Sequence, residues 1–116
     1  MIGGSGERKT LRLVAKYADI CNIIGGPQEI AHKVGVLRPH CDDIGRDPNE
    51  IEVTAMYRDI PSGASVAEVL RGAQELASVG VSTLFTGAMT GDPAGWLEST
   101  FGPAMAELAG IKPSPL

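Results

Sequence analysis

The chain has 116 residues, enough for one domain with a modest core, and its 43% hydrophobic and 21% charged residues are typical of a soluble globular protein. Its net charge of −4 and the scatter of its ten Lys and Arg argue against a nucleic-acid-binding protein. No apolar run is long enough to span a bilayer, no signal peptide opens the chain, and its two cysteines lack regular spacing. We therefore expect a cytoplasmic protein.

Turn and capping residues divide the chain into alternating strands and helices. In chain order, strands are predicted at 1–2, 19–24, 51–57 and 81–86. A helix is predicted after each strand, over 7–17, 27–44, 66–79 and 93–108. Ser65 and Glu68 predict a capping box at the start of the third helix, whereas Pro39 falls inside the second, where it should kink or destabilise the helix.

Four strand–helix units in succession predict a parallel sheet whose strands are joined by right-handed crossovers. Either a small open doubly wound sheet or part of a (β/α)8 barrel would fit this order. A barrel segment is the favoured interpretation, because a complete barrel needs about 250 residues. In addition, a domain that folds alone would rarely begin inside its own edge strand.

The turn between the first strand and the first helix is the main candidate for a binding site. Its residues, Gly3, Gly4, Ser5 and Gly6, let the backbone turn sharply and bring N–H groups close to a ligand. A helix that begins just beyond adds free amide donors and a positive dipole end, which together suit a phosphate. Turns of this kind also occur as simple connections, so both interpretations stay open. The next residue, Glu7, would repel a phosphate if its carboxylate pointed inward.

The segment IGGSGERKTLRLVAKYAD, from Ile2 to Asp19, is followed by Asn22 and closely resembles the luciferase-like monooxygenase family, especially its deazaflavin-dependent oxidoreductases. Residues 26–53 resemble the next helix and strand of these proteins, and 66–108 match only in pattern. The family fold is a (β/α)8 barrel. The resemblance therefore implies that residues 1–116 are its C-terminal half, with about four βα units and a truncated first strand. The family's N-terminal half, with much of its ring-binding pocket and its general acid or base, would lie outside this chain.

For function, the resemblance implies an oxidoreductase that transfers a hydride to or from a small organic substrate, using the deazaflavin coenzyme F420 or, alternatively, FMN. It places the cofactor phosphate on the amides of Gly3, Gly4, Ser5 and Gly6. Asn22, expected at the carboxyl end of its strand, is a further cofactor-binding candidate, although it could instead cap a loop. No catalytic residue is assigned within the chain. The alternatives to an enzyme are a non-catalytic phosphate- or cofactor-binding module and a non-functional truncated remnant.

Other polar clusters carry weaker signals. Arg8, Lys9, Arg12 and Lys16 could attract an anionic cofactor tail or form the solvated face of the first helix. No pair of His or Cys has a recognised ligand spacing, so we predict no metal site, and Cys41 is expected in the core. Because an open barrel leaves strand edges with unpaired N–H and C=O groups, we expect self-association into a homo-oligomer, and neither a membrane nor a nucleic-acid partner.

Overall fold

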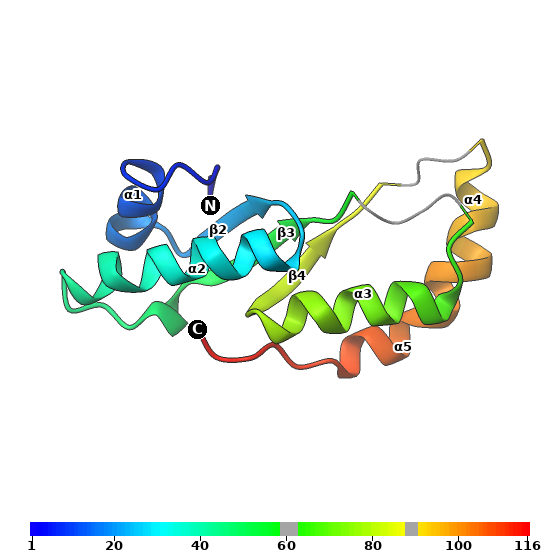
Figure 1. The fold of residues 1–116 in the computed structure, drawn as a ribbon. Coiled ribbons are helices and arrows are strands. Elements are labelled where there is room, and N and C mark those ends of the chain that lie inside the picture. The colour runs from blue at the N-terminus through cyan, green and yellow to red at the C-terminus, as the bar shows by residue number, and fades with distance from the viewer. Residues whose placement is uncertain (59–62, 88–90) are drawn as a thin grey trace.

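Four strands form one parallel sheet, and the helices between them complete an α/β domain (Figure 1). The structure, a computed structural model, describes residues 1–58, 63–87 and 91–116. Its strands are β1 (Ile2–Gly3), β2 (Ile20–Ile24), β3 (Glu52–Met56) and β4 (Val81–Phe85). Its helical segments are α1 (Thr10–Tyr17), α2 (Pro27–Asp42), the 3-10 turn η1 (Pro48–Glu50), α3 (Val66–Ser78), α4 (Pro93–Trp96), the π-helical turn η2 (Leu97–Phe101) and α5 (Gly102–Gly110). The predicted alternation and parallel sheet are confirmed.

The strands lie side by side in chain order, β1–β2–β3–β4, and each adjacent pair is parallel. Every crossover therefore moves one strand further in the same direction. A doubly wound sheet instead reverses its strand order at a switch point. The observed order has no reversal and is compatible with half of a βα barrel.

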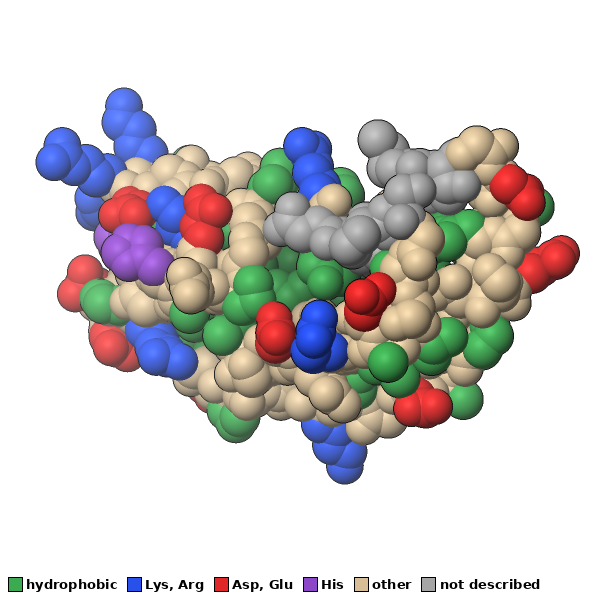
Figure 2. Space-filling model, turned by 45° about the vertical axis from the view of Figure 1, so that its right-hand side comes forward, with side chains coloured by type: hydrophobic (Ala, Val, Ile, Leu, Met, Phe, Trp, Pro, Cys, Tyr) green, Lys and Arg blue, Asp and Glu red, His purple; other side chains and the backbone are tan. Residues whose placement is uncertain are grey.

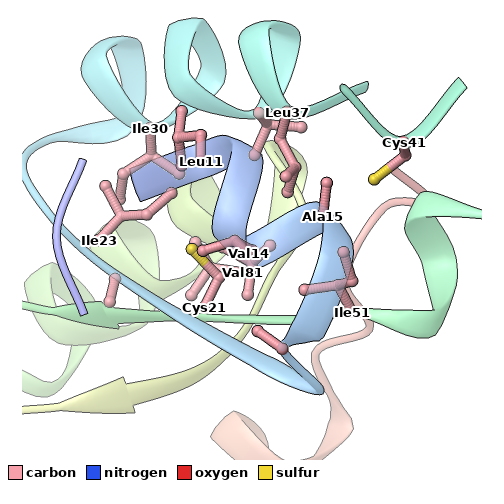
Figure 3. Packing of buried hydrophobic residues seen from close by; sticks show 14 of the residues in the cluster. Leu11, Val14, Ala15, Cys21, Ile23, Ile30, Leu37, Cys41, Ile51 and Val81 are labelled. Carbon is pink, nitrogen blue, oxygen red and sulfur yellow. The ribbon is translucent and has the colours of Figure 1, made fainter. Parts of the chain in front are cut away.

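One face of the sheet forms the core. Because side chains alternate along a strand, Cys21 and Ile23 share this face, and Val53 and Ala55 lie beside them in register. In Figure 3, Cys21 and Ile23 point toward the buried side chains of the helices, among them Leu11 and Ile30. The fully buried members of this cluster, with no more than 2% of their surface exposed, are Leu11, Val14, Ala15, Cys21, Ile23, Ile30, Val34, Leu37, Cys41, Ile51, Val53, Ala55 and Leu76. The predicted core position of Cys41 is confirmed.

The opposite face of the sheet is more exposed toward the carboxyl ends of its strands, whereas Thr54 on the same face is 2% exposed. The register places Ile24, Met56 and Phe85 in one row across this face, and Ile24 and Phe85 remain 49% and 44% exposed. A second row, nearer the amino ends of the strands, consists of Gly3, Asn22, Thr54 and Thr83. Parallel sheets are normally covered on both faces. This second face is therefore the part of the fold that is available to a ligand or a partner.

The helices differ from their predicted boundaries, most at the first and the last of them. The first begins at Thr10 rather than at residue 7, because residues 7–9 form a turn in which Leu11 N–H donates to Gly6 O. The last is divided by the π-helical turn η2, where Gly102 N–H donates to Leu97 O, five residues back. Pro103 follows Gly102 and has no N–H, so it cannot donate the hydrogen bond to the residue four positions back that an α-helix would make there. The second helix runs through Pro39 and ends at Asp42.

Burial raises the pKa of the Cys21 thiol to about 11. The native state therefore favours the neutral thiol, and this contribution to stability is lost as the pH rises from the ordinary thiol pKa of about 8.5 toward 11. We expect the stability difference between the wild type and Cys21→Ala to shrink over this range by about 2 kcal/mol. Urea unfolding at pH 8 and pH 10.5 measures it, and a difference that is the same at both would contradict the burial effect.

Candidate functional site

The glycine-rich turn follows the carboxyl end of β1, but residues 7–9 separate it from α1, so the helix expected just beyond Gly6 begins only at Thr10. Gly4 has a φ of +115°, and its N–H donates to Asn22 O at 3.1 Å, which extends the pairing of β1 with β2. A Cβ on Gly6 would come within 2.9 Å of Thr10 Oγ1. Gly4 and Gly6 thus have local structural reasons to be glycine. A Cβ on Gly3 would meet nothing within 4 Å, so the space beside Gly3 is open to a ligand.

The carboxylate of Glu7 is held on α2. Its Oε1 accepts hydrogen bonds from Lys33 Nζ and His32 Nε2, both at 2.9 Å, and its backbone oxygen lies 2.9 Å from His40 Nε2. The hydrogen bond from Lys33, followed by that from His32, holds the pKa of Glu7 below its ordinary value. The charge that could repel a phosphate at the turn is thus paired with a lysine, and the contacts tie the end of the turn to α2.

Asn22 lies beside this turn, but not where the sequence placed it. It is the third of the five residues of β2, in mid-strand, rather than at the carboxyl end, and it does not cap a loop. The expected end position is wrong because β2 continues for two residues beyond it. Its strand partner is Gly3, so the structure brings Asn22 and the turn together across β1 and β2.

Asn22 begins a hydrogen-bonded polar row that the sequence reasoning missed. Its Nδ2 donates to Thr54 Oγ1 at 2.9 Å, and Thr54 Oγ1 donates to Cys21 O at 3.3 Å. Two hydroxyl groups of β4, Thr83 Oγ1 and Ser82 Oγ, donate to Glu52 Oε1 at the start of β3, at 2.7 and 3.1 Å. Polar residues alternate with apolar ones in β3, which was the available signal. Their alignment depends on the strand register.

A second glycine turn, Gly25 and Gly26, follows β2 at the same edge of the sheet and precedes α2. This turn suits an anion less well, because a Cβ on Gly25 would overlap the carboxylate of Glu29. A carboxylate therefore already lies at the start of α2, where it interacts favourably with the positive end of the helix dipole and repels another anion. Of the two turns, the one after β1 is therefore the better candidate for binding a phosphate.

A separate apolar hollow of about 460 Å³ lies between α3, β4 and α5. Val69 and Ala73 of α3, Leu84 of β4, and Met105 and Leu108 of α5 are among its lining residues. It borders β4, three strands away from the glycine-rich turn in the sheet order. It is not part of the candidate phosphate site.

No three His, Cys, Asp or Glu side chains lie close enough to hold a metal ion in the part of the chain that the structure describes. Across residues 1–58, 63–87 and 91–116, no helix combines the length and the apolar character that a membrane span requires. No family model matches the chain, and no curated protein matches it. The resemblance to luciferase-like monooxygenases therefore has no support beyond the residues that carry it.

Proposed function

We propose that the chain is the C-terminal half of a (β/α)8 barrel related to the luciferase-like monooxygenases, and that its glycine-rich turn binds the phosphate of coenzyme F420 or FMN. The observation that carries the proposal is the open space beside Gly3, where β1 ends in register with the middle of β2. Ligands of parallel α/β folds bind beyond the carboxyl ends of the strands, and the turn follows the carboxyl end of β1. The cofactor, when bound, would supply hydride transfer to or from a small organic substrate, in an oxidoreductase.

The groups around the turn are suited to a phosphate. The backbone amides at Gly3, Gly4, Ser5 and Gly6 would surround it. The Gly4 N–H donates to Asn22 O, so it would fix the geometry of the turn rather than donate a hydrogen bond to the phosphate. Asn22 would contact the same ligand from the neighbouring strand. The Glu7 carboxylate, paired with Lys33, leaves the turn without an opposing free charge. In this proposal the residues of this chain bind and orient the cofactor, and none is assigned an acid–base role.

The part of the proposal that concerns the barrel is supported by the unreversed strand order and by the apolar and polar rows on the second face of the sheet. In a closed barrel this face would line the interior, where side chains of alternate strands pack in layers. The row of Ile24, Met56 and Phe85 and the row of Asn22, Thr54 and Thr83, from β2, β3 and β4, would face that interior.

A fluorescence titration with FMN, riboflavin and the deazaflavin coenzyme tests phosphate binding. FMN should bind at least roughly tenfold more tightly than riboflavin, which lacks the phosphate, a difference of about 1.4 kcal/mol. Gly3→Glu should remove this difference, because its carboxylate would enter the open space and repel the phosphate. Gly3→Ala is the matched control for the added bulk and should retain binding.

Two outcomes would contradict parts of the proposal. Equal affinity for FMN and riboflavin in the wild type would place the phosphate elsewhere, and no saturable binding up to about a millimolar would mean that the turn holds no cofactor. Binding without any hydride transfer would make a non-catalytic cofactor-binding module the better description.

We also propose that the chain self-associates through its exposed sheet. The outer edges of β1 and β4 carry no strand among the described residues, and the apolar row beside them is half exposed. Sedimentation velocity at micromolar concentration should show a dimer or larger species. Phe85→Asp should shift it toward monomer, whereas Leu97→Asp, which changes a similarly exposed side chain on η2, should not. A wild type that sediments as a monomer would contradict this interface.

A further inference from the structure

A groove of about 620 Å³ lies between α1 and the C-terminal end of α2. Its α1 side carries four cationic side chains: Arg8, Lys9, Arg12 and Lys16. In Figure 2, several Lys and Arg side chains project from the left end of the molecule, where Figure 1 places α1. The groove lies on the helical side of the domain, so it is distinct from the exposed sheet face.

The four cations lack ion-pair partners among the described residues. Lys33 and Arg46, by contrast, are paired with carboxylates. Lys16 instead places its Nζ 5.1 Å from the centre of the Tyr17 ring. Asp43 is the acidic residue that lines the groove. The groove carries four cations and one carboxylate on a protein whose net charge is −4, whereas six Lys and Arg and thirteen Asp and Glu lie elsewhere.

Exposed apolar side chains run beside the cations. Leu13, Tyr17 and Ile44 line the groove and are 49%, 65% and 52% exposed. They do not belong to the core, since α1 packs into the domain through Leu11 and Val14 instead. Cationic and apolar side chains thus form two adjacent rows along the groove.

The rows have the repeat of an α-helix. Arg12 and Lys16 are one helical turn apart, as are Leu13 and Tyr17, so each row repeats about every 6 Å. Carboxylates four residues apart on a second helix have the same spacing. We propose that this groove binds an amphipathic helix of a partner protein, with acidic residues on the cations and aliphatic residues on Leu13, Tyr17 and Ile44. The proposal goes beyond cofactor binding and does not depend on it.

The observations favour such a helix over nucleic acid or a lipid surface. A long polyanion would extend past the groove onto a surface with an excess of carboxylates, which would repel it. A flat bilayer would not fill a groove between two helices. A short acidic helix matches both the positive charge and the shape of the groove. It would also cover the exposed apolar side chains, which a small anion such as phosphate would leave exposed.

Fluorescence anisotropy with the full chain tests the proposal. The probe is a labelled peptide of about 18 residues with Glu and Leu in adjacent rows at four-residue spacing. A peptide of the same composition, scrambled to remove the two rows, is the control for net charge. We expect saturable binding that weakens with salt, and binding of the scrambled peptide at least roughly tenfold weaker.

Two variants with equal charge changes locate the site. Arg12→Glu with Lys16→Glu should weaken binding at least roughly tenfold, whereas Arg71→Glu with Lys112→Glu, outside the groove, should leave it within about twofold. Leu13→Asn, which retains all cations, should also weaken it. Equal binding of both peptides would overturn the proposal, and so would tighter binding of single-stranded DNA or of vesicles containing anionic lipid. Loss of FMN binding in the Gly3→Glu variant bears only on the cofactor proposal.

Discussion

Arg46→Ala is expected to lower the free energy of unfolding by about 3 kcal/mol, because the carbonyls of Ala15 and Ala18 at the end of α1 lose their charged donor. The guanidinium of Arg46, on the turn after α2, donates to Ala15 O at 2.9 Å, Ala18 O at 2.8 Å and Val14 O at 3.4 Å. A cation at a helix C-terminus also interacts favourably with the helix dipole. Thermal unfolding should shift down by roughly 10 °C or more.

Two control variants separate this capping from simple charge effects. Glu50→Gln removes the partner of Arg46 at 3.6 Å but leaves the carbonyl contacts intact, and this exposed pair should contribute under about 1 kcal/mol. Arg46→Lys retains the charge without the planar fork of donors and should fall between Glu50→Gln and Arg46→Ala. If Arg46→Ala and Glu50→Gln destabilise the chain equally, the carbonyl contacts do not stabilise the fold as described.

Ile23→Ala is expected to cost about 3 to 4 kcal/mol, whereas Ile24→Ala, one residue further along β2, should cost under about 1 kcal/mol. Ile23 is fully buried against the helices, and Ile24 is 49% exposed on the other face. Urea unfolding of both variants at low concentration, where self-association is weakest, compares the two faces directly. Since a one-residue slip exchanges the faces of a strand, equal losses or a larger loss for Ile24→Ala would contradict the register.

The order of elements was predictable because its signals are local. Glycine and proline punctuation placed all four strands within one or two residues, and the capping box of Ser65 and Glu68 is present, with both hydrogen bonds formed. Right-handed crossovers between short apolar strands then imply a parallel sheet. Local signals do not distinguish a barrel from a doubly wound sheet, because the two differ in the order of their strands. The observed order has no reversal and is compatible with half of a barrel.

Features that depend on contacts distant in sequence were not predictable. Arg46 caps a helix about 30 residues away, and Thr54 receives a hydrogen bond from Asn22 on the neighbouring strand. The late start of α1 has a local cause instead, the hydrogen bond from Leu11 N–H to Gly6 O. Helical periodicity alone gives no sign of it, because the charged residues 7–9 are compatible with either a turn or a helix.

The candidate site was partly predictable. The glycine turn followed from the spacing of Gly3, Gly4 and Gly6, but their different roles depend on the backbone angle at Gly4 and on the position of Thr10. The direction of Glu7 depends on α2 packing against the turn, which placed Lys33 within reach. The sequence shows that a carboxylate follows the turn, and the structure shows that it is paired with Lys33 and His32 of α2.

The most direct test of the cofactor proposal is to observe the turn itself during binding. Amide resonances of the ¹⁵N-labelled chain can be followed by NMR while FMN, riboflavin or inorganic phosphate is added. The proposal predicts that FMN and phosphate shift the amides of Gly3, Gly4, Ser5 and Gly6 and the side-chain amide of Asn22, and that riboflavin shifts them much less. Shifts that instead centre on the apolar hollow around Val69 and Leu108, with an unchanged glycine turn, would contradict phosphate binding at this site.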